Sequence, residues 1–219
     1  MTILKILLTK NMNKILFLDI LSTGMDIKRC AIYRIGGIYT EDGVEKKRFD
    51  FRVRPFPGAR ISDQSLWVGG VDRSILAHYP DQEKVFEEFI AMLNEFVEVR
   101  NSRDKMYLAG FNTATMDAPF LWQWFNINRN ERNRDYFHMQ IMDMMTVAGF
   151  ALMDERRSMQ DFKLESVARQ LRIYPGEGDT SDCIQNAKTC LDIYRHMRTR
   201  FGLEQFDDTS ECSELIKNY

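Results

Sequence analysis

The chain has 219 residues, a formal net charge of -2 from 30 basic and 32 acidic side chains, and 44% hydrophobic residues. These values are typical of one soluble globular domain, and they exclude a disordered, collagen-like or disulfide-scaffold protein. No apolar run approaches the roughly 18 residues of a membrane-spanning helix, so no membrane association is expected. The near-neutral charge argues against binding nucleic acid by bulk electrostatics.

The charge is unevenly distributed, and this defines the expected organisation of the chain. Residues 204–219 contain five acids and one base, which leaves residues 1–203 with a charge of +2. We expect an extension or extra strand over 1–13, with Met12 as an alternative start, a single domain over 14–203, and an acidic tail over 204–219. The four cysteines lack zinc-ligand spacing, which favours free thiols in a cytoplasmic protein.

Three strands are predicted first along the chain. The apolar run 14–19 predicts a strand buried on both faces that ends at an acid. Residues 29–40 predict a second strand. The Asp-Gly turn within 41–44 leads into a third strand over 45–54. Together these segments predict an antiparallel meander.

Helices and strands alternate after the meander. Apolar residues at helical spacing predict a long helix over 81–99. The further expectations are strands over 106–111 and 136–142 and helices over 116–125, 143–153, 161–171 and 181–200. This order predicts an α/β fold with a mixed five-stranded sheet flanked by helices. Trp67, Trp122 and Trp124 are expected in the core or an interface rather than as stacking platforms for bases.

Polar residues recur where the predicted parallel strands end. Asp19 closes the first strand before a Thr-Gly turn, and Asp117 begins the helix that follows the strand 106–111. Residues 180–190 open the last long helix. Ligands of open α/β sheets gather at such carboxyl ends. Each segment alone is weak evidence, because an Asp at a strand end or helix start is more often structural.

Taken together, these segments resemble the proofreading-type 3'-5' exonucleases, the DnaQ-like (DEDDh) superfamily, which has an RNase H-like fold. The resemblance covers about residues 14–200 and is nearest to stand-alone bacterial and phage exonucleases. It rests on Phe-Leu-Asp-x-x-x-Thr-Gly at 17–24, Gly-Phe-Asn-x-x-x-x-Asp-x-x-Phe-Leu at 110–121 and Ile-x-Asp at 141–143. It implies hydrolysis by two Mg²⁺ or Mn²⁺ ions held by four carboxylates, with a histidine as general base.

Three of the five catalytic positions implied by this resemblance hold unsuitable residues. Asp19 and Asp117 match the pattern, but Leu21 replaces a Glu, Ser181 replaces the His, and Asn186 replaces the final Asp. Two divalent ions bring a charge of +4, whereas the two remaining acids supply only -2. We therefore expect at most one weakly bound Mg²⁺ or Mn²⁺ ion, or none.

The expected function is that of a catalytically impaired or inactive 3'-5' exonuclease-like protein. It would bind a single-stranded nucleic acid, a 3' end, or a protein partner in nucleic-acid processing. One alternative is an active exonuclease with relocated ligands, for which Asp182 is the candidate substitute. Another is a structural protein that uses the fold as a scaffold, in the host cytoplasm or a virion if phage-encoded. The candidate nucleic-acid-binding residues are Thr23, Gly24, Asn112, Arg129, Arg132 and Arg134.

Overall fold

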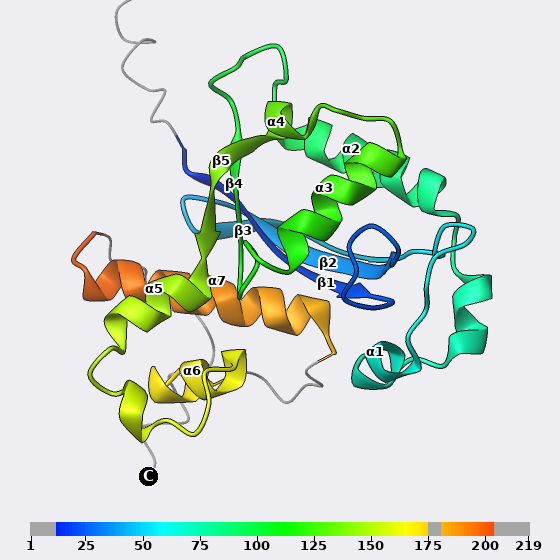
Figure 1. Cartoon of the computed structure of the whole chain (residues 1–219). Coiled ribbons are helices and arrows are strands. Elements are labelled where there is room, and N and C mark those ends of the chain that lie inside the picture. Colours follow the sequence, from blue (N-terminus) through cyan, green and yellow to red (C-terminus); the bar gives the residue numbers. More distant parts are fainter. Residues whose placement is uncertain (1–11, 175–180, 204–219) are drawn as a thin grey trace, which may run out of the picture.

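A five-stranded mixed sheet forms the centre of the protein (Figure 1). The computed structural model describes residues 12–174 and 181–203, so the expected N-terminal extension and acidic tail lie almost wholly outside the described residues. The strands are β1 (Lys14–Ser22), β2 (Ile32–Glu41), β3 (Val44–Arg52), β4 (Met106–Gly110) and β5 (Phe137–Asp143). Their order is β3-β2-β1-β4-β5. β1 pairs antiparallel with β2 and parallel with β4, which confirms the predicted mixed sheet.

The central strand β1 is buried on both faces because its residues are apolar without alternation. Leu16 and Leu18 contribute to the core on one face, and Ile15 and Phe17 to the core on the other. Helices α2 (Gln82–Phe96) and α3 (Asp117–Ile127) cover the first face. Helices α5 (Met144–Ala151), α6 (Leu164–Gln170) and α7 (Cys183–Arg200) cover the second. The site described below lies at the end of this buried strand.

Short helical elements fill three connections where no helix was predicted. Between β3 and α2 the chain forms α1 (Asp63–Val68) and the 3-10 helix η2 (Arg73–His78). Before β5 it forms α4 (Asn133–Tyr136), and after α5 the 3-10 helix η3 (Arg156–Ser158). Local side chains start two of them, since Ser62 caps α1 and Asp72 caps η2. Such three- to six-residue elements are too short to produce a readable hydrophobic period.

The tryptophans occupy three different environments. Trp124 is buried and Trp122 is half-buried, as expected for α3. Trp67 is 81% exposed, so of the two expected environments, core or interface, the core is excluded for this residue. The reason is the shortness of α1, whose buried residue is Leu66, so that the next side chain is directed outwards.

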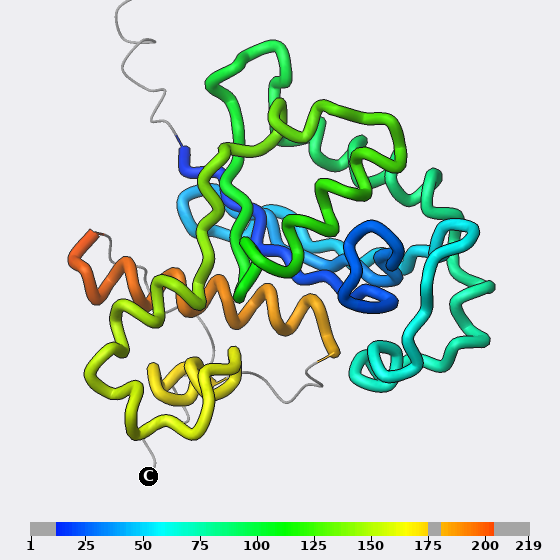
Figure 2. Tube along the Cα trace, viewed as in Figure 1, coloured from blue at the N-terminus to red at the C-terminus, as the bar shows by residue number. Residues whose placement is uncertain are grey.

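The parallel strands β1, β4 and β5 end at one edge of the sheet, which we call the carboxyl edge. Helix α3 starts there, at Asp117, and its 11 residues carry the chain about 16 Å back along the sheet. Figure 2 shows this return path, which leads through the connection 128–132 to α4 and the start of β5. The connection after α3 therefore lies at the opposite, amino edge. No helix among the described residues is long and apolar enough to cross a membrane.

Candidate functional site

Two acids meet at the carboxyl edge, one from β1 and one from α3. Asp117 stands in the first turn of α3 and is 6% exposed, and its Oδ1 accepts a hydrogen bond of 3.0 Å from the backbone N–H of Ile20. Burial raises the pKa of Asp117 well above its ordinary value, and the neighbouring charge of Asp19 raises it further. The fold therefore brings together the two acids that the sequence singled out.

The last helix supplies two donors to Asp19. The side-chain amide of Asn186 donates to Asp19 Oδ2 over 3.2 Å, and the thiol of the buried Cys183 donates to the same carboxyl group. Burial raises the pKa of Asp19, while these two hydrogen bonds oppose the rise. The group at position 186 that approaches Asp19 is thus a neutral donor.

Leu21 closes the site on the side of α1. It packs against a small apolar cluster formed by Tyr33, Leu66 and Leu76. A Cβ added at Gly69 would lie 3.6 Å from the Leu21 Cδ1 atom and 1.7 Å from the Tyr33 hydroxyl oxygen, so this turn requires glycine. The position that a metal-binding Glu would occupy in the resembled family is here part of a hydrophobic contact.

Arg34 is a fixed positive charge beside the site, and no sequence pattern marked it. It lies opposite Leu21 in the β1–β2 register. Its guanidinium group donates to both carboxylate oxygens of Asp50 over 2.9 and 2.8 Å, and to the backbone carbonyl of Ser181 over 2.7 Å. The Arg34 side chain is only 11% exposed. Its positive charge lowers the pKa of Asp19 and so favours the ionised carboxylate. A single Arg within a hydrophobic strand carries no signal that would locate it here.

Asp182 caps the last helix. Its carboxylate accepts from the backbone N–H groups of Ile184 and Gln185 over 2.9 and 3.2 Å, and it lies 3.5 Å from the Arg34 guanidinium. Ser181, just before it, is 8% exposed. The candidate substitute ligand is therefore already engaged in a helix cap and an ion pair.

Thr23 and Gly24 shape the turn after β1. Thr23 is fully buried, and its hydroxyl donates to the carbonyl of Arg60 and accepts from the N–H of Ala31. A Cβ at Gly24 would lie 2.7 Å from the Cys30 sulfur, so only glycine fits. Both residues act on this turn through packing and backbone placement.

The turn at Asn112 is held by Asp143, which entered the sequence analysis only as part of the resemblance to a family. Asp143, at the end of β5, accepts from the backbone N–H groups of Asn112 and Ala114 over 2.9 and 3.1 Å and from Met145 over 3.0 Å. Asn112 has a φ of 59°, a left-handed conformation that Asn tolerates better than most residues. Asp143 thus fixes the turn that leads to Asp117.

The three candidate arginines are not part of this site. Arg129, Arg132 and Arg134 are exposed near the C-terminal end of α3, at the amino edge of the sheet. Arg132 forms an ion pair with Asp135. They were candidates because of the basic composition of their loop, and α3 separates this loop from the two aspartates.

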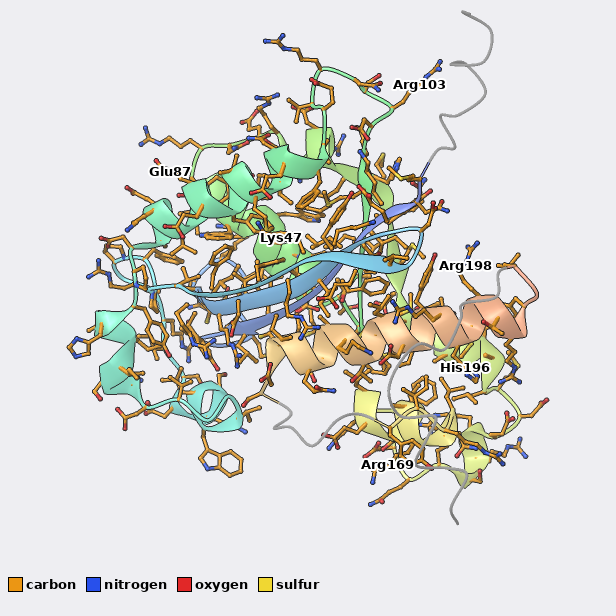
Figure 3. All side chains as sticks on the ribbon, turned by 180° about the vertical axis from the view of Figure 1, so that it is seen from behind. Lys47, Glu87, Arg103, Arg169, His196 and Arg198 are labelled. Atoms are coloured by element: carbon orange, nitrogen blue, oxygen red, sulfur yellow. The ribbon has the colours of Figure 1, made fainter. Side chains whose placement is uncertain are left out.

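Two of the described histidines, His138 and His196, lie away from the carboxyl edge and are unsuited to act as a base. His138 is near the start of β5, where its ring lies 4.4 Å from that of Tyr107. His196 is ten residues beyond Asn186 along α7, about 15 Å away. Figure 3 shows His196 in the later part of α7, far from the start of that helix.

The donor set does not fit two metal ions. Asp19 and Asp117 offer carboxylate oxygens, whereas Leu21 offers none and Asn186 presents its N–H group. Among residues 12–174 and 181–203, no group of three or more His, Cys, Asp or Glu is placed to hold an ion. Mg²⁺ and Mn²⁺ prefer several oxygen ligands.

No family model and no curated protein matches this sequence. Solved structures of E. coli exonuclease I share its fold. The complex with a dA16 oligonucleotide has a TM-score of 0.68 and 14% identity, over 86% of this chain and 41% of that one. The dT13 complex gives 0.70 and 14%, over 87% and 42%. A zinc-bound form with single-stranded DNA gives 0.69 and 14%, over 86% and 41%.

These neighbours identify the fold. The chain spans about two fifths of the length of exonuclease I, and the low identity limits the likeness to architecture. The mixed sheet flanked by helices is an exonuclease-like, RNase H-like α/β fold, as the sequence predicted.

Proposed function

We propose that the protein binds the end of a single-stranded nucleic acid at the carboxyl edge and is catalytically impaired or inactive as a 3'-5' exonuclease. The observation that carries this proposal is the hydrogen bond from the Asn186 amide to Asp19. In the pattern that the chain resembles, an acid at this position shares metal ions with Asp19. Here the residue at this position, Asn186, donates a hydrogen bond to Asp19 from a neutral amide. This contact requires no cation.

The residues that remain are poorly equipped for hydrolysis. Ser181 has no useful basicity near neutral pH, and loss of a general base costs about 10² to 10⁴ in rate. Two acids cannot balance two divalent ions, and loss of one ion removes further transition-state stabilisation. Any Mg²⁺ or Mn²⁺ at Asp19 and Asp117 would therefore be single and weakly held.

Binding is supported by what the fold preserves. The turns at Thr23–Gly24 and at Asn112 are each fixed by hydrogen bonds or close packing at the carboxyl edge. Structures with the same fold contain dA16 and dT13 oligonucleotides. We propose that these turns hold a strand end and that Arg129, Arg132 and Arg134 contact phosphates of longer strands at the amino edge.

The alternative of an active exonuclease needs a relocated ligand. Asp182 is the nearest candidate, but it would have to leave two backbone N–H groups and Arg34. The remaining alternative, a structural or interaction protein, would use the fold without any nucleic acid.

The decisive experiment uses the full chain with end-labelled single-stranded DNA and RNA, in EDTA, Mg²⁺ and Mn²⁺. We expect salt-dependent binding in all three buffers and no shortening of either substrate. Shortening that disappears in an Asp19→Ala variant would show an active exonuclease and overturn the proposal. Absence of binding to both nucleic acids would favour the scaffold alternative.

A further inference from the structure

An exposed tryptophan stands on α1, the short helix that packs against Leu21. Trp67 is 81% exposed, and the neighbouring Val68 is 61% exposed, on a helix of only six residues. A fully solvated indole costs free energy because its large apolar surface remains in water. Among the described residues, Trp67 is the most exposed of the large hydrophobic side chains. Its exposed aromatic face is therefore available to a binding partner.

The helix that carries Trp67 is anchored to the site rather than to a remote surface. Leu66 packs in the cluster that includes Leu21, two residues beyond Asp19 on β1. The Gly69 turn at the end of α1 also lies against Leu21. At the other end of α1, the N–H of Ser62 donates to the carbonyl of Thr23 over 2.7 Å. These contacts place α1, the helix that carries Trp67, next to the carboxyl edge.

Basic side chains stand on the two segments that support α1. Lys28, Arg29 and Arg60 are exposed, and the Arg60 N–H donates to the Arg29 carbonyl. Arg29 pairs with Asp26. Within the described part of the chain, Lys28 and Arg60 have no recorded ion pair, so their charges remain available to an anion. An aromatic face beside unpaired cations is the combination that binds single-stranded nucleic acid.

We propose that Trp67 is the stacking platform for an unpaired base of the bound strand, with Lys28 and Arg60 contacting its phosphates. This inference rests on the proposed function, because it assigns a subsite to the same strand end. Stacking on an indole is tolerant of sequence, since every base has an aromatic face. The platform therefore provides affinity without base selectivity.

The test measures binding of a labelled dT oligomer by anisotropy and by tryptophan emission, in EDTA. The wild-type protein should bind with quenching of the exposed indole. Trp67→Ala should weaken binding about 5- to 100-fold with an unchanged salt slope, because the indole carries no charge. Trp67→Phe should retain part of the affinity but lose the quenching. Arg60→Ala should reduce the salt slope by about 0.7.

Phe150→Ala is the matched control, because Phe150 is a 71% exposed aromatic on α5, away from α1. It should bind like the wild type. Wild-type binding that is unchanged in Trp67→Ala would overturn this inference and leave the proposed function standing. No binding by the wild-type protein would overturn both.

Discussion

At position 186, the difference between an amide and a carboxylate determines the chemistry of the site. Asn and Asp have nearly the same shape, but Asn brings a donor and no charge. The Asn186 amide reaches Asp19 over 3.2 Å and partly offsets the desolvation that raises the pKa of Asp19. A carboxylate there would instead add repulsion in a buried region, which only a cation would relieve.

We therefore predict that Asn186→Asp is less stable than the wild type in EDTA, by about 1 to 3 kcal/mol. It loses a hydrogen bond and places a third acid beside Asp19 and Asp117. Mn²⁺ should raise its melting temperature more than that of the wild type. Thermal unfolding in EDTA and in Mn²⁺ measures both effects.

Asn186→Ala is the control for this prediction, because it removes the donor without adding charge. It should lose stability but gain no response to Mn²⁺. An equal Mn²⁺ response in all three proteins would contradict the view that position 186 limits metal binding.

At the scale of elements, the hydrophobic periodicity of the sequence predicted the long helices and strands well. The predicted helix over 81–99 corresponds to Gln82–Phe96, and the buried strand over 14–19 to Lys14–Ser22. The helices over 63–78 were missed because each depends on a local cap and on one buried side chain. A periodic signal needs two or more turns, so elements of this length leave none.

The start of α7 combines a helix cap with an ion pair. Their contributions to the free energy of unfolding can be measured separately. Asp182→Ala should lower the free energy of unfolding by about 1 kcal/mol, because two backbone N–H groups lose their acceptor. Asp182→Asn keeps the cap and removes the charge beside Arg34. Since Asp182 is 44% exposed, that ion pair is screened, and Asn should cost only a few tenths of a kcal/mol.

Chemical denaturation of the two variants tests this prediction. Equal losses for Ala and Asn would mean that the charge beside Arg34, rather than the cap, stabilises the helix start.

At the scale of the whole molecule, the sequence located the two aspartates but not their surroundings. Asp19 and Asp117 follow parallel strands, and the rule for carboxyl ends brought them together. Arg34 and Trp67 depend on cross-strand register and on the path of a short helix, which no local pattern encodes. The basic composition that marked Arg129 and its neighbours does not reveal at which edge of the sheet a loop lies.

The buried acid pair should make overall stability depend on pH. The pKa of Asp117 is raised in the folded protein above its ordinary value of 3.8. As pH rises from 4, the unfolded chain ionises first and binds fewer protons than the folded chain, so stability falls. Asp117→Asn removes this loss and keeps an acceptor for Ile20.

We predict that Asp117→Asn unfolds at a higher temperature than the wild type at pH 7 in EDTA, and that the gain shrinks as pH falls towards 4. Thermal melts across this range measure it. A gain that does not change with pH, or a loss at pH 7, would contradict the assigned cause.

The hydrogen bond between Asp19 and Asn186 joins residues 167 positions apart in the chain. The first strand and the last described helix therefore both contribute to this site, and Figure 2 shows α7, in orange, running below β1, in blue. During synthesis on the ribosome, Asp19 emerges long before its partner, and contacts of such separation form late in folding. The carboxyl edge is thus completed only when α7 docks, and the contact between Asp19 and Asn186 marks that stage of folding.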